Sequence, residues 1–136
     1  MKIDKLDIGL DLMQVINEAK RSNGPWFEAL MIAAQVQADR RAKYSGADFT
    51  EQDPYTNFII VASIMGITVR RVFRFYIAQK VARIMVSQTD HDDERYQDTL
   101  TDLANYSLLA AGWELRSEEE KQLAIAKIVS IELTQD

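Results

Sequence analysis

Three polar residues, Asp98, Asp102 and Asn105, have the spacing of a single helix face. They stand in the stretch YQDTLTDLANYSLL, which covers residues 96–109. At 100° per residue their side chains fall within about 60° of one another. Two carboxylates and an amide on one face are oxygen ligands of the kind that Mg²⁺ prefers, so half of a metal or nucleotide site is one interpretation. A solvated helix face or the acidic side of a buried ion pair would carry the same residues.

The residues that follow argue against a face that points into water. Leu109 falls on the same side as the aspartates, and Tyr106 and Trp113 lie close to it in the helical projection. Because a helix that is apolar on all sides is buried, we expect the aspartates at the rim or inside of a helical bundle. The opposite side is the predicted core stripe, made of Tyr96, Leu100, Leu103, Ala104, Ser107 and Ala110.

A cationic segment precedes this acidic one. Residues 70–83 contain five Lys and Arg and no acid, whereas residues 90–120 contain ten acids and two Arg. Two antiparallel helices whose facing charges pair would explain the segregation, and a basic phosphate site is the alternative. Lys80 and Arg83 share a side with apolar residues of their helix. An interior pair of Lys80 with Asp102 is one interpretation, and a pocket in which both cations hold phosphate is the other.

Capping and breaking residues divide the chain into helices. Asp53 followed by Pro54 and, later, Thr68 are typical of helix starts. Gly66 is typical of a helix end, and SEEE at residues 117–120 is a capping box that starts another helix. The predicted helices cover approximately residues 7–21, 25–44, 57–65, 68–88, 94–115 and a segment from 117 onward.

The first two predicted helices carry apolar stripes that we expect to face a core. The first stripe is Ile8, Leu12, Val15, Ile16 and Ala19, and the second is Phe27, Leu30, Met31, Ala34 and Ala38. The second helix ends in Arg40, Arg41 and Lys43, where cations suit the helix dipole. With five Gly, two Pro and no strand pattern, the chain is predicted to form one all-α domain over residues 1–136, a bundle of five to six helices.

Composition excludes several classes of function. The absence of Cys removes disulfides and thiolate metal sites. No apolar run approaches the ~18 residues of a membrane span, so we expect a cytoplasmic protein with no membrane partner. The net charge of −5 weighs against nucleic-acid binding. The single histidine, His91, lies in an acidic turn, which argues against a catalytic triad, and no Gly-rich phosphate loop is present.

Three separated stretches resemble one family. AKYSGADFTEQDPYTNF, then GIT followed by AQKVARI, and finally QDTLTDLANYSLL are similar to bacteriophage proteins associated with nucleotide modification. These look like relatives of the all-α MazG-like nucleotide pyrophosphohydrolases. The match covers roughly residues 40–112, and neither residues 1–35 nor residues 117–136 contribute to it.

The resemblance implies a MazG-like helical bundle that binds a nucleotide, often as a homo-oligomer of two or more copies in the cytoplasm of a bacterial host. In active relatives, acidic side chains hold Mg²⁺, which screens phosphates and helps water attack a phosphoanhydride. By position, Asp98 and Asp102 would bind the metal and Lys80 and Arg83 would face phosphate. The implied polar groups of the nucleotide pocket are Tyr44, Asn57 and Asn105.

The chain departs from the family pattern at Lys43, Gln79 and Gln97, each of which replaces an expected acid. Each change removes a potential ligand, although Asp39 and Asp48 are acids that could compensate. The sequence therefore leaves two hypotheses open. One is an Mg²⁺-dependent nucleotide hydrolase. The other is a non-catalytic binder on the same scaffold, which sequesters a nucleotide or antagonises a host defence protein.

Overall fold

The computed structural model describes residues 12–45, 53–86 and 93–133, and this part of the chain is all-α. It contains six helices and no strand. In chain order they are α1 (Leu12–Ser22), α2 (Gly24–Ser45), α3 (Thr56–Met65), α4 (Val69–Val86), α5 (Asp93–Leu115) and α6 (Glu118–Leu133). The predicted helices agree with these bounds where they can be compared.

The predicted helix signals act as expected at three of four places. Gly66 ends α3 with φ 65°, a left-handed conformation that favours glycine. The Thr68 hydroxyl accepts from the Arg71 N–H at the start of α4. Ser117 and Glu120 exchange the two hydrogen bonds of a capping box. Asp53 is different.

The prediction that Asp53 caps the third helix was wrong, because α3 begins three residues later, at Thr56. The Asp53 carboxylate instead accepts from the Tyr55 N–H, and its carbonyl accepts from the Thr56 hydroxyl. Such short-range bonds of Asp compete with helix geometry and favour a turn. The turn aims Asp53 at α5, where it contributes to a wall of the site described below.

The core lies where α3, α4, α5 and α6 meet. Its most deeply buried side chains are Phe73, Ile59 and Val72. The rings of Tyr55 and Phe58 pack on Phe73 with centroids 6.0 and 4.4 Å away. The remaining buried members are Tyr55, Ala62, Val69, Trp113 and Ile128.

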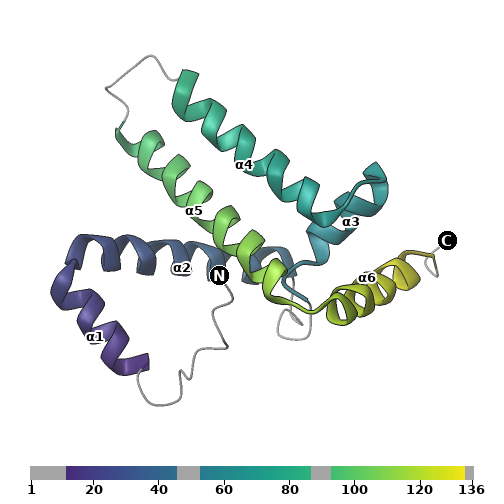
Figure 1. Ribbon diagram of the computed structural model, residues 1–136. Coiled ribbons are helices and arrows are strands. Elements are labelled where there is room, and N and C mark those ends of the chain that lie inside the picture. Colours follow the sequence, from purple (N-terminus) through teal and green to yellow (C-terminus); the bar gives the residue numbers. More distant parts are fainter. Residues whose placement is uncertain (1–11, 46–52, 87–92, 134–136) are drawn as a thin grey trace.

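Figure 1 shows α4 and α5 side by side and antiparallel, with α2 crossing α5 and α6 turned away from α5. The facing charges of α4 and α5 pair as predicted: Lys80 with Asp102, and Arg70 with Glu114. None of the helices in the described ranges combines the length and apolar character that a membrane crossing requires.

Three predicted apolar faces lie largely outside the core. Helix α1 buries no residue, and in α2 Ala33 is buried while Leu30, Met31, Ala34 and Ala38 are exposed. The predicted stripe of α5 is correct in part: Leu100, Leu103 and Ala110 are half-buried, and Ala110 packs on the core, but Tyr96, Ala104 and Ser107 are exposed. Periodicity identified the helices, but it did not identify which side other helices cover.

Candidate ligand-binding site

Asp102 lies between two cations from different helices. Its Oδ1 accepts a 2.5 Å hydrogen bond from Arg40 Nη2 of α2, and its Oδ2 lies 2.9 Å from Lys80 Nζ of α4. The Lys80 and Asp102 side chains are only 12 % and 18 % exposed, so water screens this pair weakly. The interior pair that the sequence offered as one alternative is therefore present, and Arg40 extends it to three groups.

Electrostatics keep this carboxylate charged. Burial raises the pKa of Asp102, but hydrogen bonds from Lys80 and Arg40 outweigh burial and place its pKa below the ordinary 3.8. The pKa of the neighbouring Tyr106 phenol is raised by burial and by the Asp102 charge. At neutral pH the site thus presents a carboxylate, two cations and a protonated phenol.

Next to these charges lies a cavity of about 220 Å³, which we call the polar cavity. Arg40 and Arg41 of α2 line it, together with residues of α3, α4, α5 and the turn at Asp53. Its amide side chains are Gln37, Asn57 and Asn105, and its aromatic side chains are Phe58, Tyr76 and Tyr106. The cavity therefore combines positive charge, amide hydrogen-bonding groups and aromatic rings.

Asn105 brings a buried amide nitrogen without a hydrogen-bond partner to this cavity. The residue is only 5 % exposed, yet its Nδ2 has no hydrogen-bond partner. Leaving a buried amide donor unpaired costs on the order of 1–3 kcal/mol. A ligand atom that accepts from this amide would recover that free energy.

The aromatic wall is ordered around a stacked pair. The rings of Tyr76 and Tyr106 are 5.1 Å apart and nearly parallel, at 8°. Phe58 meets both edge-on, at 5.9 Å from Tyr76 and 6.3 Å from Tyr106. Lys80 Nζ lies 5.9 Å from the Tyr106 ring centroid, so the rings are next to the ion pairs that Asp102 forms with Lys80 and Arg40.

A second, more apolar cavity of about 490 Å³ adjoins the polar one between α2 and α5. The two share Gln37, Arg41, Asn105 and Leu109 as lining residues. Leu30, Ala34 and Leu108 contribute to the apolar cavity alone. Asn105 therefore lines both a charged compartment and a hydrophobic one.

A bidentate ion pair fixes the turn at Asp53, which lines one side of the polar cavity. Arg116 donates to both oxygens of Asp53, at 2.7 and 3.1 Å. Burial raises the pKa of Asp53, but the bonds from Arg116 and from the Tyr55 N–H outweigh it and lower that pKa. The Arg116 guanidinium also lies 4.7 Å from the Tyr55 centroid, and the Tyr55 hydroxyl donates to the Leu109 carbonyl. The turn at Asp53 is thus tied to α5.

The structure gathers some of the predicted site residues and separates others. Asn57 and Asn105 line the polar cavity, and Lys80 and Asp102 pair beside it. Asp98 and Arg83 are exposed and line none of the cavities described here. Tyr44 lies in the last turn of α2, but its side chain, like Asp48 and His91, falls outside the described residues.

The described side chains do not assemble the implied Mg²⁺ site. No group of three or more His, Asp and Glu in residues 12–45, 53–86 and 93–133 is placed to hold a metal. Both oxygens of Asp102 are already engaged by cations, and Asp39 accepts a hydrogen bond from Gln35 at 2.8 Å. As arranged, Asp98 and Asp102 do not fit the role of a metal-binding pair.

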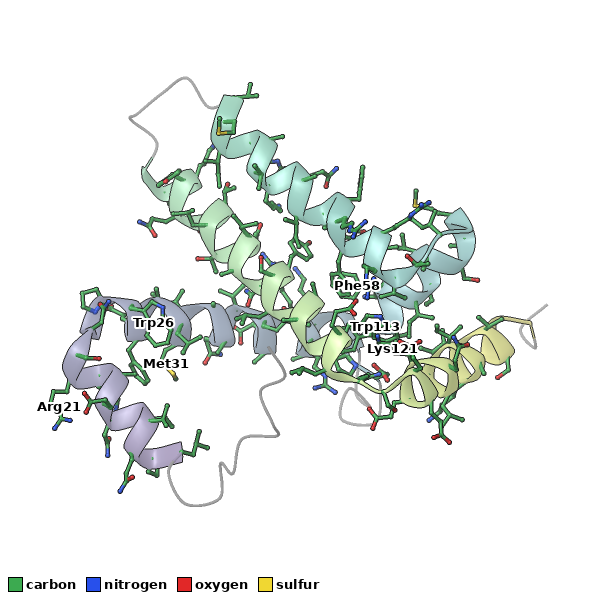
Figure 2. The ribbon with its side chains drawn as sticks, in the orientation of Figure 1. Arg21, Trp26, Met31, Phe58, Trp113 and Lys121 are labelled. Atoms are coloured by element: carbon green, nitrogen blue, oxygen red, sulfur yellow. The ribbon has the colours of Figure 1, made fainter. Side chains whose placement is uncertain are left out.

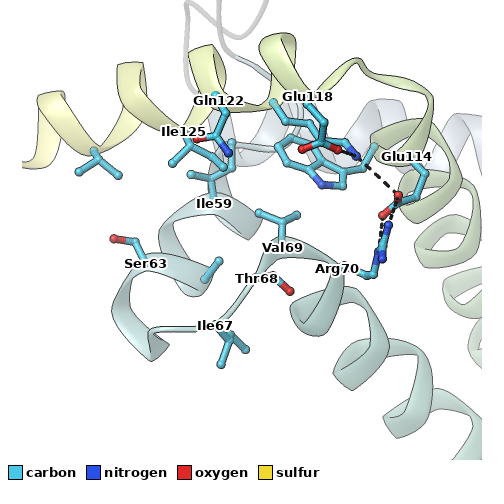
Figure 3. A pocket seen from close by; sticks show the side chains of 14 residues that line it. Ile59, Ser63, Ile67, Thr68, Val69, Arg70, Glu114, Glu118, Gln122 and Ile125 are labelled. Carbon is cyan, nitrogen blue, oxygen red and sulfur yellow. Dashed lines mark hydrogen bonds and ion pairs between the residues drawn. The ribbon is translucent and has the colours of Figure 1, made fainter.

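Another cavity of about 490 Å³ lies between α3, α6 and the start of α4, away from every predicted site residue. Its charged groups satisfy one another, as Figure 3 shows for Arg70 and Glu114. The buried Lys121 ammonium lies 3.2 Å from Glu118 and 3.6 Å from Glu114. The unpaired amide of Asn105 lines the polar cavity and not this one, so this cavity offers a ligand less than the polar one.

Sequence reasoning overlooked Arg40, Arg41 and the stacking of Tyr76 on Tyr106. The two arginines had been assigned to the helix dipole. Arg40 follows the buried Ala33 by seven residues, which places both on one helix face. That spacing was the available signal, but the exposed apolar residues of α2 obscured which face was covered.

Comparison with known proteins gives no relative for this site: no protein-family model, curated protein or solved structure matches the chain.

Proposed function

We propose that the protein binds a nucleotide in the polar cavity and does so without an obligatory metal ion. The observation that carries this proposal is the buried, unpaired amide of Asn105, which lines the cavity beside Arg40 and Arg41. A buried polar group without a partner is rare in folded proteins. A bound ligand is the simplest way to satisfy it.

The neighbouring groups define the class of ligand. Two arginines suit a phosphate, because the guanidinium fork matches pairs of phosphate oxygens. In the adjoining apolar cavity the ring of Tyr55 and aliphatic side chains offer contact to a planar base, and base–aromatic stacking contributes about 1–3 kcal/mol per base. Asn105 would donate to a ring nitrogen or a carbonyl of the base.

Size also favours a nucleotide that spans both cavities. The polar cavity of about 220 Å³ is smaller than the roughly 300–1,000 Å³ of usual small-molecule sites. The adjoining cavity of about 490 Å³ shares the wall at Asn105. A base in the apolar compartment with phosphates toward Arg40 uses both.

Arg40 is suited to exchange partners during binding. Its side chain is 41 % exposed, whereas Lys80 is 12 % exposed. Arg40 can therefore turn to an incoming phosphate while Lys80 continues to neutralise Asp102. Binding by this route leaves Lys80 paired with Asp102 Oδ2 and places an arginine against the phosphate, so it does not depend on Mg²⁺.

Calorimetric titration with a panel of nucleoside mono-, di- and triphosphates, with Mg²⁺ or with a chelator, tests the proposal. We expect saturable binding that persists with the chelator and is lost in Asn105→Leu, which replaces the amide by an apolar group with the same branching at Cγ. Gln122→Leu, in the cavity beside α6, is the matched control and should bind as the wild type does.

The same variant has a second signature that a merely structural asparagine would not give. Removing a buried, unpaired donor should raise the melting temperature of Asn105→Leu while abolishing binding. No binding by the wild type across the panel would overturn the proposal. Binding only with Mg²⁺, together with release of pyrophosphate, would replace it with the hydrolase hypothesis and return Asp98 and Asp102 to the role of ligands.

A further inference from the structure

The arm of the molecule, which we define as α1 and residues 24–32 of α2, exposes an unusual amount of apolar surface. Figure 2 shows the arm projecting from the rest of the chain, with Trp26 and Met31 labelled on it. Seven of its large apolar side chains are 36 to 66 % exposed: Leu12, Met13, Val15, Trp26, Leu30, Met31 and Ile32. No residue of α1 is buried.

Such an arm is not expected to be stable alone in water. Helix α1 has 11 residues, and among the described helices its main packing partner is α2. Isolated helices shorter than about 12–15 residues are marginal without tertiary packing. From residue 24 to residue 34 the only charge is Glu28, and a helix that is apolar on all sides belongs in an interior.

We propose that the arm packs against the arm of a second copy of this chain, which forms a symmetric dimer. The arm carries two acids and two bases (Glu18, Glu28, Lys20 and Arg21), so two arms meet without net repulsion. The other exposed apolar face, around Phe75 and Met85 of α4, lies on a helix with five cations and no acid. Two copies of that helix would repel each other.

The exposed area is sufficient for such a dimer. Seven large side chains at half exposure supply on the order of 100 Å² each, or about 700 Å² per copy, close to the ~800 Å² per partner of a standard interface. Two antiparallel helical hairpins joined by a two-fold axis make a four-helix bundle with an isologous interface. The charge balance and the area therefore select a second arm as the occupant.

Because the chain has no cysteine, single thiols can report the interface directly. Met31→Cys and Val15→Cys, treated with a short bis-maleimide at micromolar concentration, should form covalent dimers. Met85→Cys is the matched control, since Met85 is 78 % exposed but lies on α4, and it should remain monomeric on a denaturing gel. Cross-linking of Met85→Cys but of neither arm variant would overturn the arm interface.

Sedimentation of the full chain provides the second test. The wild type should sediment as a dimer that dissociates on dilution, and Met31→Glu should raise the dissociation constant at least tenfold. Leu123→Glu, at an equally exposed position of α6, should leave the dimer intact. A wild type that is monomeric at every concentration would overturn the proposal.

Discussion

The core around Phe73 and the arm at the start of the chain are built from similar helices, yet they differ in what covers them. In the core, apolar sides of α3, α4, α5 and α6 meet, and Phe73, Ile59 and Val72 lose almost all contact with water. In the arm, an equally apolar stretch of α2 touches little besides α1. An apolar face thus needs a surface to pack against, and within residues 12–45, 53–86 and 93–133 such a surface covers the core but not the arm.

The largest expected effect is loss of the core's central ring. Phe73→Ala removes a fully buried side chain and should lower the free energy of unfolding by about 3–5 kcal/mol, because it leaves a cavity. Phe75→Ala, two residues away on the same helix and 56 % exposed, should change it by less than about 0.5 kcal/mol in the monomer. Urea unfolding measures both. Equal losses would mean that the two faces of α4 are covered alike.

The next effect depends on close packing between α5 and the turn before α3. A Cβ added at Gly112 would lie 2.5 Å from the Tyr55 hydroxyl oxygen, so Gly112→Ala should cost about 1–3 kcal/mol. In a Tyr55→Phe background that contact is absent and the next ring atom is 3.8 Å away. The same change should then become neutral or stabilising, because Ala favours a helix over Gly by about 1 kcal/mol.

A double-mutant cycle read by thermal unfolding tests this change of sign. Gly24→Ala is the control, because nothing lies within 4 Å of its added Cβ. If Gly112→Ala is equally harmful with Tyr55 or with Phe at position 55, the helix backbone rather than the hydroxyl contact determines the cost.

The sequence predicted the helices well because their signals are local. Gly66, Thr68 and the box at Ser117 act within one turn of the chain, so neighbours determine their effect. The paired charges of α4 and α5 were also predictable, since opposite charges were segregated on consecutive segments. These features need no knowledge of distant packing.

The site was predictable only in part, because it forms where distant segments meet. Asn57, Lys80, Asp102 and Asn105 were identified, but Arg40 reaches Asp102 across 62 positions of the chain. No local pattern specifies that crossing of α2 over α5. The same lack of long-range information placed the predicted core stripe of α5 on Tyr96 and Ser107, which are exposed.

The Asp102 carboxylate is partly buried and the Glu114 carboxylate is exposed, so Asp102→Asn should have the larger effect of the two. We expect a loss of about 1–2 kcal/mol at pH 7, less than the 3–5 kcal/mol of a fully buried pair. The pKa of Asp102 is lower in the folded chain than the ordinary 3.8. Its contribution is therefore complete above about pH 5 and is lost as the pH falls through the folded pKa.

Chemical unfolding of wild type and Asp102→Asn from pH 7 to pH 2.5 measures this difference. The two stability curves should converge below pH 4. Curves that stay parallel would show that the substitution acts through shape or packing rather than through the carboxylate charge.

The smallest effect belongs to the exposed pair of Arg70 with Glu114. The bidentate hydrogen bond from Arg70 lowers the pKa of Glu114 from 4.5 to about 2, which places its pH-dependent contribution between about pH 4.5 and 2. Because both side chains are more than a third exposed, solvent screening limits the loss in Glu114→Gln to less than about 1 kcal/mol.

Salt distinguishes the two carboxylates. Raising ionic strength to 1 M should remove most of the Glu114 effect and leave most of the Asp102 effect, since partly buried pairs are screened less. Equal salt sensitivity of the two variants would mean that Asp102 is as open to water as Glu114, and the electrostatic distinction between the site and the surface would fail.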